Sequence, residues 1–317
     1  MQILGLDIGK DRLDLALLDD ATGVLTDAQH ANCPDGIAAL VAQLSAWAPE
    51  LIVLEATGPY HAPVLRVLVA QGLPVAVVNP AQVKAFRQSR LGRSKTDRQD
   101  ARLLARFGAT YAAELRRYTS PSATQAQLTA WVRYRDSLVA ERTRLVSQQE
   151  AATWQGDSQV QTWLTERLAQ TTQHLAAVDA AIAQLLAELP EAEVLQTVSG
   201  VGPRVAAAVL AYVPAALWGN AKAAAAYAGV HPHLEQSGRT SRSWLSKRGP
   251  ARLRRYLYMA ALVAVRHDAA IQAFYDRLRD HGKAPMVALC AVMHKLLRQM
   301  MGRLRAAQAT KEVPLAA

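Results

Sequence analysis

Residues 1–20, MQILGLDIGKDRLDLALLDD, decide how the N-terminal part of the chain folds. The segments Ile3–Ile8 and Leu13–Leu18 are short and mostly apolar, and only four residues separate them. This pattern is typical of two neighbouring strands of one sheet. Asp7 nevertheless lies inside the first segment. Because a buried carboxylate without a partner is energetically costly, the sequence predicts that Asp7 has a partner, a metal ion or a raised pKa.

Strand and helix patterns alternate over the first 110 residues. Turn signals at Gly58-Pro59 and Asn79-Pro80 close two of the apolar runs. Two tightly joined strands, a third strand and then β/α units predict a mixed sheet with helices on its faces. The expected further strands are 26–32, 51–56 and 74–78, and the expected helices are 34–46, 59–70, 81–89 and 97–107.

The middle of the chain, residues 116–190, shows a heptad pattern. One apolar row runs through Leu168, Leu175, Ile182 and Leu189, and a second row runs through Leu164, Thr171, Val178 and Leu185. Two long helices folded into an antiparallel hairpin fit this pattern. A coiled coil with another protomer fits it too, and would make the protein a homo-oligomer, a dimer or a tetramer.

Residues 191–317 are predicted to be mostly helical. They contain a Gly-x-Gly turn, VSGVG (residues 198–202), and an expected loop, GVHPHLEQSGRTSRSWLSKRGP (residues 229–250). Backbone N–H groups in such turns can bind phosphates without reading sequence, which makes Gly200 and Gly202 candidate nucleic-acid contacts. A pair of glycines that ends a helix is an equally simple explanation.

The 317 residues carry a net charge of +10, which is distributed unevenly. Residues 79–106 carry +6 and residues 201–317 carry +13, whereas residues 1–78 carry −6. Clustered positive charge indicates a polyanionic partner, most often nucleic acid. Cys33 and Cys290 are the only cysteines and are far apart in sequence, which is typical of a protein in the reducing cytosol. No apolar run is long enough to span a bilayer. We therefore expect a cytoplasmic protein with no membrane partner.

Four acidic residues are candidates for a metal centre. Asp7 and Glu55 belong to apolar runs of the predicted sheet, and Asp97 and Asp100 are three residues apart on one helix face. Converging carboxylates can hold Mg²⁺ or Mn²⁺ ions that flank a phosphate. Taken singly, each acid has an ordinary explanation as a turn cap, a first-turn acid or an ion-pair partner. The flanking basic residues would bring a nucleic-acid backbone to this centre: Lys84, Arg87, Arg90, Arg93 and Lys95.

A second basic segment surrounds Ser237. Residues 237–266 hold eight Lys or Arg and no acid, and Ser237 precedes a glycine, which lets the backbone approach a ligand closely. On spacing alone a turn serine or a phosphate-contacting hydroxyl is the simpler explanation, because no local His/Asp pair is evident to activate a nucleophile. The candidate nucleic-acid contacts of this segment are Arg239, Arg242, Lys247, Arg248, Arg252, Arg254 and Arg255.

The motifs in combination resemble a known family. The acids lie in LDIG (6–9), LEATG (54–58) and KTDRQDA (95–101), followed by VSGVGPRVAAAVLAY (198–212), YAGVHP (227–232), QSG (236–238) and LRRYLYMAA (253–261). Over nearly the whole chain this order is similar to the DEDD transposases of the IS110 insertion-sequence family, which includes the Piv-type DNA invertases. The resemblance implies an α/β, RuvC-like domain of the ribonuclease-H fold over residues 1–115, a helical coiled-coil segment over 116–190, and a mainly α transposase domain over 191–317.

The resemblance also implies an activity. Such a recombinase would cut and rejoin double-stranded donor and target DNA, with Asp7, Glu55, Asp97 and Asp100 as metal ligands. Ser237 would be the nucleophile of a covalent phosphoserine intermediate, and a structured guide RNA would choose the DNA sites. Three alternatives remain open at this point: a Holliday-junction nuclease that uses water, a phosphotransferase of the sugar-kinase and actin-like class, and a DNA-packaging protein. The last alternative leaves the four acids unexplained.

Overall fold

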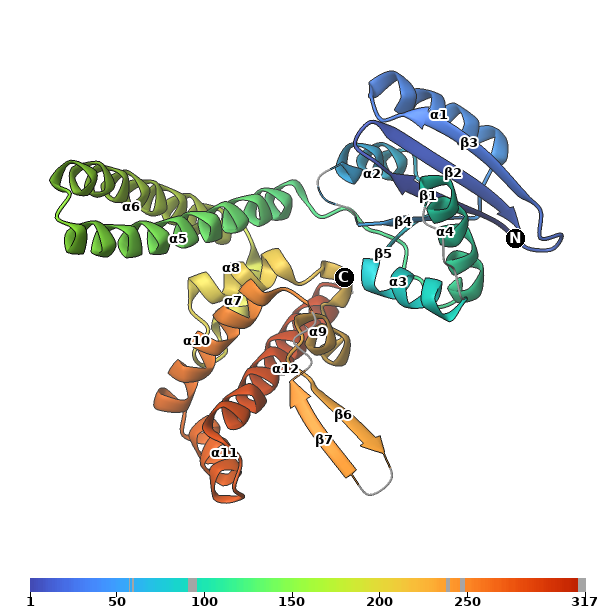
Figure 1. Cartoon of the computed structure of the whole chain (residues 1–317). Coiled ribbons are helices and arrows are strands. Elements are labelled where there is room, and N and C mark those ends of the chain that lie inside the picture. The colour runs from blue at the N-terminus through green and yellow to red at the C-terminus, as the bar shows by residue number, and fades with distance from the viewer. Residues whose placement is uncertain (57, 59, 91–95, 238–239, 246–248, 313–317) are drawn as a thin grey trace, which may run out of the picture. The chain divides into compact units, whose positions relative to one another are not determined.

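The computed structural model describes residues 1–56, 58, 60–90, 96–237, 240–245 and 249–312, and it divides into two compact units, Met1–Ser120 and Pro121–Ala317. Figure 1 shows their helices and strands. The boundary follows the helix α4 (Asp97–Tyr111), and the long helical segment that the heptads predict groups with the C-terminal residues. In the described residues, no helix is both long and apolar enough to cross a membrane.

The first unit is built on a mixed five-stranded sheet. Its strands are β1 (Gln2–Ile8), β2 (Arg12–Asp19), β3 (Leu25–Ala31), β4 (Leu51–Glu55) and β5 (Val75–Val78), in the order β3-β2-β1-β4-β5. The pairs β1–β2 and β2–β3 are antiparallel, and β1–β4 and β4–β5 are parallel. A three-stranded meander with two parallel strands added beside its first strand is the topology of the ribonuclease-H fold, so the fold predicted from sequence is confirmed.

Alternate residues of the strands pack against two different pairs of helices. Leu4, Leu6 and Ile8 of β1 belong to one core with α1 (Pro34–Trp47) and α2 (His61–Ala70). Ile3 of β1 and Val53 of β4 belong to a second core with α3 (Pro80–Ser89) and α4 (Asp97–Tyr111). Because side chains alternate along a strand, Asp7 is on the same face as Ile3, the face that α4 covers.

Gly5 sets how closely α4 approaches the sheet. A side-chain carbon at residue 5 would collide with the carbonyl oxygen of Ala101 and the backbone nitrogen of Ala105, both in α4. The first turns of α4 can therefore lie directly over β1 only because residue 5 has no side chain.

We expect Gly5→Val to destabilise the protein by at least about 3 kcal/mol, because backbone atoms of a packed helix cannot move aside as a flexible side chain can. Urea unfolding followed by circular dichroism measures this loss. Gly23→Val is the matched control, because a side chain at that exposed turn would meet nothing within 4 Å; its own strain, at φ 73°, should cost only about 1–2 kcal/mol. Equal losses in the two variants would contradict the close packing of α4.

The second unit begins with an antiparallel hairpin of two long helices, α5 (Ala123–Gln155) and α6 (Ser158–Ala187), which Figure 1 shows side by side. Leu138 and Leu145 of α5 and Leu175 and Ile182 of α6 are buried within this single chain. Asp157 caps α6 by accepting hydrogen bonds from the backbone of the first turn. Of the two arrangements that the heptads allow, the chain thus forms the hairpin; assembly with a second protomer stays a prediction.

The rest of this unit is helical apart from one ribbon. Its helices are α7 (Pro190–Gln196), α8 (Pro203–Tyr212), η1 (Ala215–Leu217), α9 (Ala221–Ala228), α10 (Ala251–His267), α11 (Ala269–Asp280) and α12 (Pro285–Glu312). The strands β6 (Pro232–Ser237) and β7 (Thr240–Leu245) pair antiparallel and project from the helices (Figure 1). A loop was predicted here, and that prediction is wrong. The strands are polar and lack the apolar alternation that marks a half-buried strand, so the pattern gave no strand signal.

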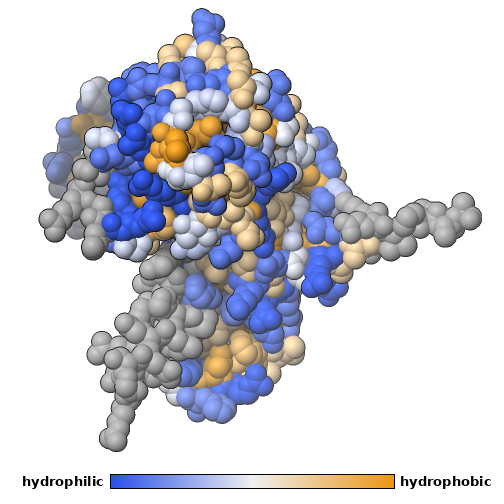
Figure 2. Space-filling model, turned by 90° about the vertical axis from the view of Figure 1, so that its right-hand side faces the viewer, coloured by the Kyte–Doolittle hydropathy of each residue, from blue (hydrophilic) through white to orange (hydrophobic). Residues whose placement is uncertain are grey.

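Most of the large apolar side chains that the structure describes lie in the cores. Figure 2 shows hydrophilic residues interspersed with smaller apolar patches on one face. Among the described residues, the large apolar side chains that remain exposed include Trp154 and Trp163, which are 92% and 56% exposed and belong to the helical hairpin. Isolated exposed apolar residues of this kind are common on protein surfaces.

Candidate metal centre and nucleic-acid surface

Strand pairing brings three carboxylates together on the sheet face that α4 covers. Asp7 of β1 is the direct cross-strand partner of Asp14 of β2. The parallel pairing of Leu6 with Leu54 places Glu55 of β4 next to Asp7 on the other side. Residues 7, 14 and 55 therefore come from the three central strands and lie on one face, at the end of the sheet where β1 and β4 end and β2 begins.

The first turn of α4 adds two further carboxylates. Thr96 caps this helix by accepting a hydrogen bond from the backbone of Gln99, and Asp97 and Asp100 follow in the first turn. The close approach at Gly5 carries this turn over β1. A helix N-terminus favours negative charge, which partly offsets the repulsion among the acids.

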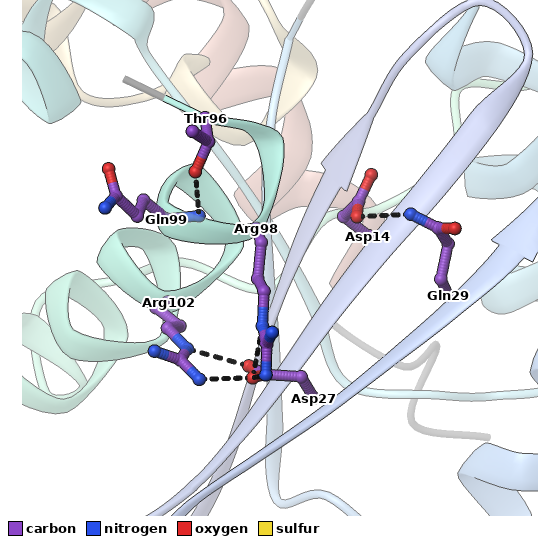
Figure 3. A network of polar contacts seen from close by, with 7 residues as sticks. All are labelled: Asp14, Asp27, Gln29, Thr96, Arg98, Gln99 and Arg102. Carbon is purple, nitrogen blue, oxygen red and sulfur yellow. Dashed lines mark hydrogen bonds and ion pairs between the residues drawn. The ribbon is translucent and has the colours of Figure 1, made fainter. Parts of the chain in front are cut away.

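An ion-pair network fixes α4 against β3. Arg98 donates from Nε to Asp27 Oδ2 at 2.6 Å, and Arg102 donates from Nε to Asp27 Oδ1 at 2.9 Å (Figure 3). The hydrogen bond from Arg102, more than any other interaction, holds the pKa of Asp27 below its ordinary value. Figure 3 also shows Gln29 donating to Asp14, at 2.8 Å. Side chains outside the predicted tetrad thus hold the helix and one strand acid in place.

Asp7 carries the clearest electrostatic signature of the site. Its pKa is raised from 3.8 to about 6, chiefly by burial and then by the negative charges of Asp100, Asp97, Glu55 and Asp14, in that order of importance. Four other carboxylates therefore lie close enough to contribute repulsion to this shift. The sequence argument that Asp7 needs a partner, a metal or a raised pKa is met by the last of these.

Two of the acids are held by arginines. Arg12 donates from Nη2 to Asp97 Oδ2 at 2.7 Å, and Arg87 donates from Nη2 to Asp100 Oδ1 at 2.6 Å. Within the described parts of the chain, no three His, Cys, Asp or Glu side chains are already grouped so that they could hold a metal ion. The donor chemistry nevertheless suits a hard divalent cation, because all the groups are carboxylates and their crowded negative charge is what such a cation would relieve.

A stability prediction follows from Asp7. Because its folded-state pKa of about 6 lies above the ordinary 3.8, the neutral carboxyl favours the folded state. This stability is fully present below pH 3.8 and is lost as the pH rises through about 6. Asp7→Asn should therefore stabilise the metal-free protein above pH 6, by about 1 kcal/mol after allowing for the partial solvent exposure of the group.

Urea unfolding in the presence of a chelator, at a series of pH values, measures this gain. It should grow between about pH 4 and pH 6 and then stay constant. A variant that is less stable than the original protein at pH 7.5 would contradict the repulsion inferred at Asp7.

Sequence reasoning missed two members of this cluster. Asp14 is only 7% exposed, accepts from Gln29 and lies 3.5 Å from Arg12, so it is a fifth acid of the same face. The signal was present: two apolar strands joined by a short turn must pair, and Asp7 and Asp14 occupy equivalent places in them. Arg12, the first residue of β2, gave no signal, because its pairing with Asp97 spans 85 residues of sequence.

The predicted basic contacts near the acids have different surroundings. Lys84 is exposed on α3, and the Arg90 guanidinium lies 5.2 Å from the centre of the Phe86 ring. Arg87 is engaged by Asp100 and is not a free surface cation in this structure. Arg93 and Lys95 lie outside the described residues.

The predicted nucleic-acid contacts of the second unit also have different surroundings. Arg254 donates to the carbonyl oxygens of Ala228 and Gly249, at 3.3 and 3.0 Å, so it ties α10 to the end of α9. Arg252 is exposed and donates to the carbonyl of Arg133 at 3.3 Å, and Arg255 is exposed. Arg242 lies on β7, and Arg239, Lys247 and Arg248 lie outside the described residues.

The two glycines of the Gly-x-Gly turn have different surroundings: one is packed against a helix and the other is exposed. Gly200 has φ 79°, and a side-chain carbon there would collide with the carbonyl oxygen of Ala260, so this glycine is required by packing against α10. Gly202 is exposed, and a side-chain carbon there would meet nothing within 4 Å. It begins α8 without a side-chain cap. Of the two predicted phosphate contacts, only Gly202 is at an accessible helix start.

Ser237 is the last residue of β6 and pairs with Thr240 of β7. Its backbone therefore lies at the end of the ribbon, next to residues 238 and 239, which lie outside the described residues. Ser241 and Ser243 pair with Gln236 and Leu234, further along the ribbon. Ser237 is thus the serine of β6 and β7 that lies at the tip.

Comparison with known proteins identifies the family. Residues 4–152 match a DEDD transposase family model described as "Transposase", and residues 192–276 match one described as "Transposase IS116/IS110/IS902 family". The pilin gene-inverting protein of Moraxella lacunata is 29% identical over 310 residues, which covers 93% of this chain and 92% of that protein. The insertion element IS110 43.6 kDa protein of Streptomyces coelicolor is 24% identical over 378 residues, covering 95% and 93%.

Among solved structures, T. thermophilus RuvC in complex with a Holliday junction substrate is similar to 37% of this chain and 99% of its own, with 17% identity and a TM-score of 0.32. The two family models together span most of the chain, and the sheet topology of the first unit agrees with the expected nuclease fold. The chain belongs to the IS110 family of transposases.

Proposed function

We propose that this transposase cuts and rejoins double-stranded DNA through a divalent-metal site formed by Asp7, Glu55, Asp97 and Asp100 and through Ser237 as nucleophile. The observation that carries the metal site is the convergence of strand acids and first-turn acids on one face of the sheet, reported by the raised pKa of Asp7. Family membership makes the chain a DNA recombinase, which removes the phosphotransferase and packaging alternatives.

Each part of the site has a separate task. Bound to the four acids, Mg²⁺ or Mn²⁺ would supply positive charge that stabilises the attacking and leaving oxygens at a phosphate. The rigid strands β1 and β4 hold Asp7 and Glu55, and the anchor of Arg98 and Arg102 on Asp27 holds the first turns of α4 over them. Precise positioning of this kind is what phosphoryl transfer requires from a protein.

Ser237 supplies the covalent step of the proposal. Its Oγ would form a bond to phosphorus while the bond from phosphorus to one sugar oxygen breaks, and the hydroxyl proton would end on that leaving oxygen. The phosphodiester energy is then kept in the serine ester, so the strands can be rejoined by the reverse step without ATP. The support is the family motif QSG at residues 236–238, the place of Ser237 at the ribbon tip and the basic surrounding sequence.

The proposed partners follow from charge and family. Residues 201–317 carry 18 Lys or Arg against five Asp or Glu, which suits a phosphate backbone. A structured guide RNA would choose donor and target DNA by base pairing, so that the protein itself needs no base-reading motif. Two or more protomers would bring the two DNA partners together.

The experiment uses the full chain expressed with the DNA that flanks its gene. Copurified nucleic acid is sequenced, and joining of two plasmids that carry the flanking DNA is measured with Mg²⁺, with chelator and after ribonuclease treatment. We expect joining that requires the metal and is lost after ribonuclease treatment. Joining in chelator would refute the metal site, and joining after ribonuclease treatment would refute the guide RNA. Metal-dependent cutting that leaves free ends would favour the water-using nuclease.

A further inference from the structure

Two arginines engage the same carboxylates that the proposed function assigns to a metal ion. Arg12 lies between Asp97, at 2.7 Å, and Asp14, at 3.5 Å, and Arg87 lies 2.6 Å from Asp100. A guanidinium held this close satisfies the lone pairs of a carboxylate oxygen and repels a second cation. The guanidinium and a divalent ion therefore compete for Asp97 and for Asp100.

We infer that Arg12 and Arg87 are resident counter-cations of the acidic site, which neutralise Asp97 and Asp100 in the metal-free protein and which a divalent ion must displace. This rests on the proposed function, because it takes the four acids as the metal ligands. It explains why five carboxylates lie together while no three acids are already grouped as ligands within the described residues.

The two ion pairs differ in strength. The side chains of Arg87 and Asp100 are 23% and 16% exposed, whereas those of Arg12 and Asp97 are 55% and 57% exposed. Water and salt screen an exposed pair far more than a partly buried one. Arg87 is therefore the main competitor of the metal, and Arg12 is the weaker one.

Displacement would also connect the metal to nucleic acid. Arg87 shares α3 with the exposed Lys84, and the exposed Arg90 directly follows this helix, so a released guanidinium joins a basic surface. Guanidinium groups bind phosphate oxygens well. A phosphate backbone that takes Arg87 from Asp100 frees this carboxylate for the metal. By linkage, DNA then raises the affinity for metal and metal raises the affinity for DNA.

The test is titration of the purified full chain with Mn²⁺, with free Mn²⁺ followed by electron paramagnetic resonance. Arg87→Gln should lower the Kd by about tenfold and Arg12→Gln by about two- to threefold, because each removes a competing positive charge. Arg106→Gln, at an exposed position of α4, is the matched control and should leave the Kd unchanged. Arg87→Lys, which keeps the charge, should stay close to the original protein.

A short duplex DNA provides a second measurement. It should tighten Mn²⁺ binding to the original protein several-fold and should have a smaller effect on Arg87→Gln. Equal or weaker Mn²⁺ binding by Arg87→Gln would overturn the inference and make Arg87 a residue that positions Asp100. Circular dichroism checks that this variant is folded, and Arg12→Gln tests the same inference independently.

Asp7→Asn separates this result from a failure of the proposed function. If the original protein and Asp7→Asn bind Mn²⁺ equally, the acidic site holds no metal and the proposed function fails. If Asp7→Asn removes a Mn²⁺ site and Arg87→Gln still does not tighten binding, only the inference about the arginines fails.

Discussion

Amide substitution of any acid of the proposed tetrad should abolish strand cleavage while weakening nucleic-acid binding by no more than a few-fold. We expect Asp7→Asn and Glu55→Gln to lower the cleavage rate on the order of a thousandfold or more. Charge stabilisation by a metal ion is worth several kcal/mol in such reactions, and each 1.36 kcal/mol is a factor of about ten in rate. Binding persists because the basic surfaces, not the acids, attract the phosphate backbone.

Asp7→Asn is the sharpest of these variants, because it should also make the metal-free protein more stable above pH 6. A loss of activity in a more stable protein cannot be attributed to unfolding. A loss of activity in Asp97→Asn or Asp100→Asn is harder to interpret, because Asp97→Asn also removes the ion pair with Arg12 and Asp100→Asn the one with Arg87.

Asp20→Asn is the control, since this exposed carboxylate follows the opposite end of β2 from Asp14. Cleavage of plasmid DNA with Mn²⁺ is measured beside a filter-binding assay of the same variants. Full cleavage by Asp7→Asn or Glu55→Gln would refute the proposed metal site, and the family assignment would not rescue it.

The sheet of the first unit could be predicted because its strands are buried and short. Apolar runs such as Leu51–Glu55 are bounded by turn residues, so their ends were predicted to within one or two residues. The pairing of β1 with β2 follows from the tight connection, and the helices from their periodic apolar residues. That Asp7 and Glu55 would lie near each other at one end of the sheet could also be predicted, because both follow apolar strand runs. The addition of Asp97 and Asp100, which lie on a helix, was implied by the family resemblance.

Long-range polar contacts could not be predicted in this way. The pairs Arg12–Asp97 and Arg98–Asp27 join residues 85 and 71 positions apart, and many arginines of this chain could have made either contact. Periodicity reports which side chains are buried and says nothing of which charges meet. For this reason no sequence pattern indicated the ion pair between Arg87 and Asp100, and the role of Arg87 as a phosphate contact stays a prediction.

The helical hairpin shows a second limit. A seam of Leu175, Ile182 and their neighbours needs an apolar partner, and a helix of the same chain satisfies this need as well as a helix of another. The structure shows the first arrangement. Polar substitutions at these positions would therefore disrupt the hairpin itself, and any test of assembly must use exposed residues of α5 and α6.

The role of Ser237, at the ribbon tip, distinguishes a recombinase mechanism from a nuclease mechanism. If Ser237 attacks phosphorus, DNA becomes covalently attached to the protein and can be rejoined. If water attacks, no link forms and the ends stay free. The acidic site is compatible with both, so its geometry does not decide between them.

Ser237→Ala should keep nucleic-acid binding and lose strand exchange by roughly 10⁴-fold or more, because a missing nucleophile commonly costs several orders of magnitude in rate. The change is small enough to leave the ribbon intact, since Ser237 contributes a backbone pair with Thr240 that alanine can make equally well. Far-UV circular dichroism and the affinity for DNA check this.

The decisive measurement is the protein–DNA adduct. A nicked or mismatched substrate traps the intermediate, denaturing electrophoresis separates the adduct, and peptide mapping locates the attached residue. The original protein and Ser243→Ala, which changes a serine further along the same ribbon, should form the adduct, and Ser237→Ala should form none. An adduct that maps to another residue would mean that a different nucleophile attacks phosphorus. Cleavage by Ser237→Ala at the original rate, without an adduct, would mean that water attacks. Either result would refute the proposed serine mechanism.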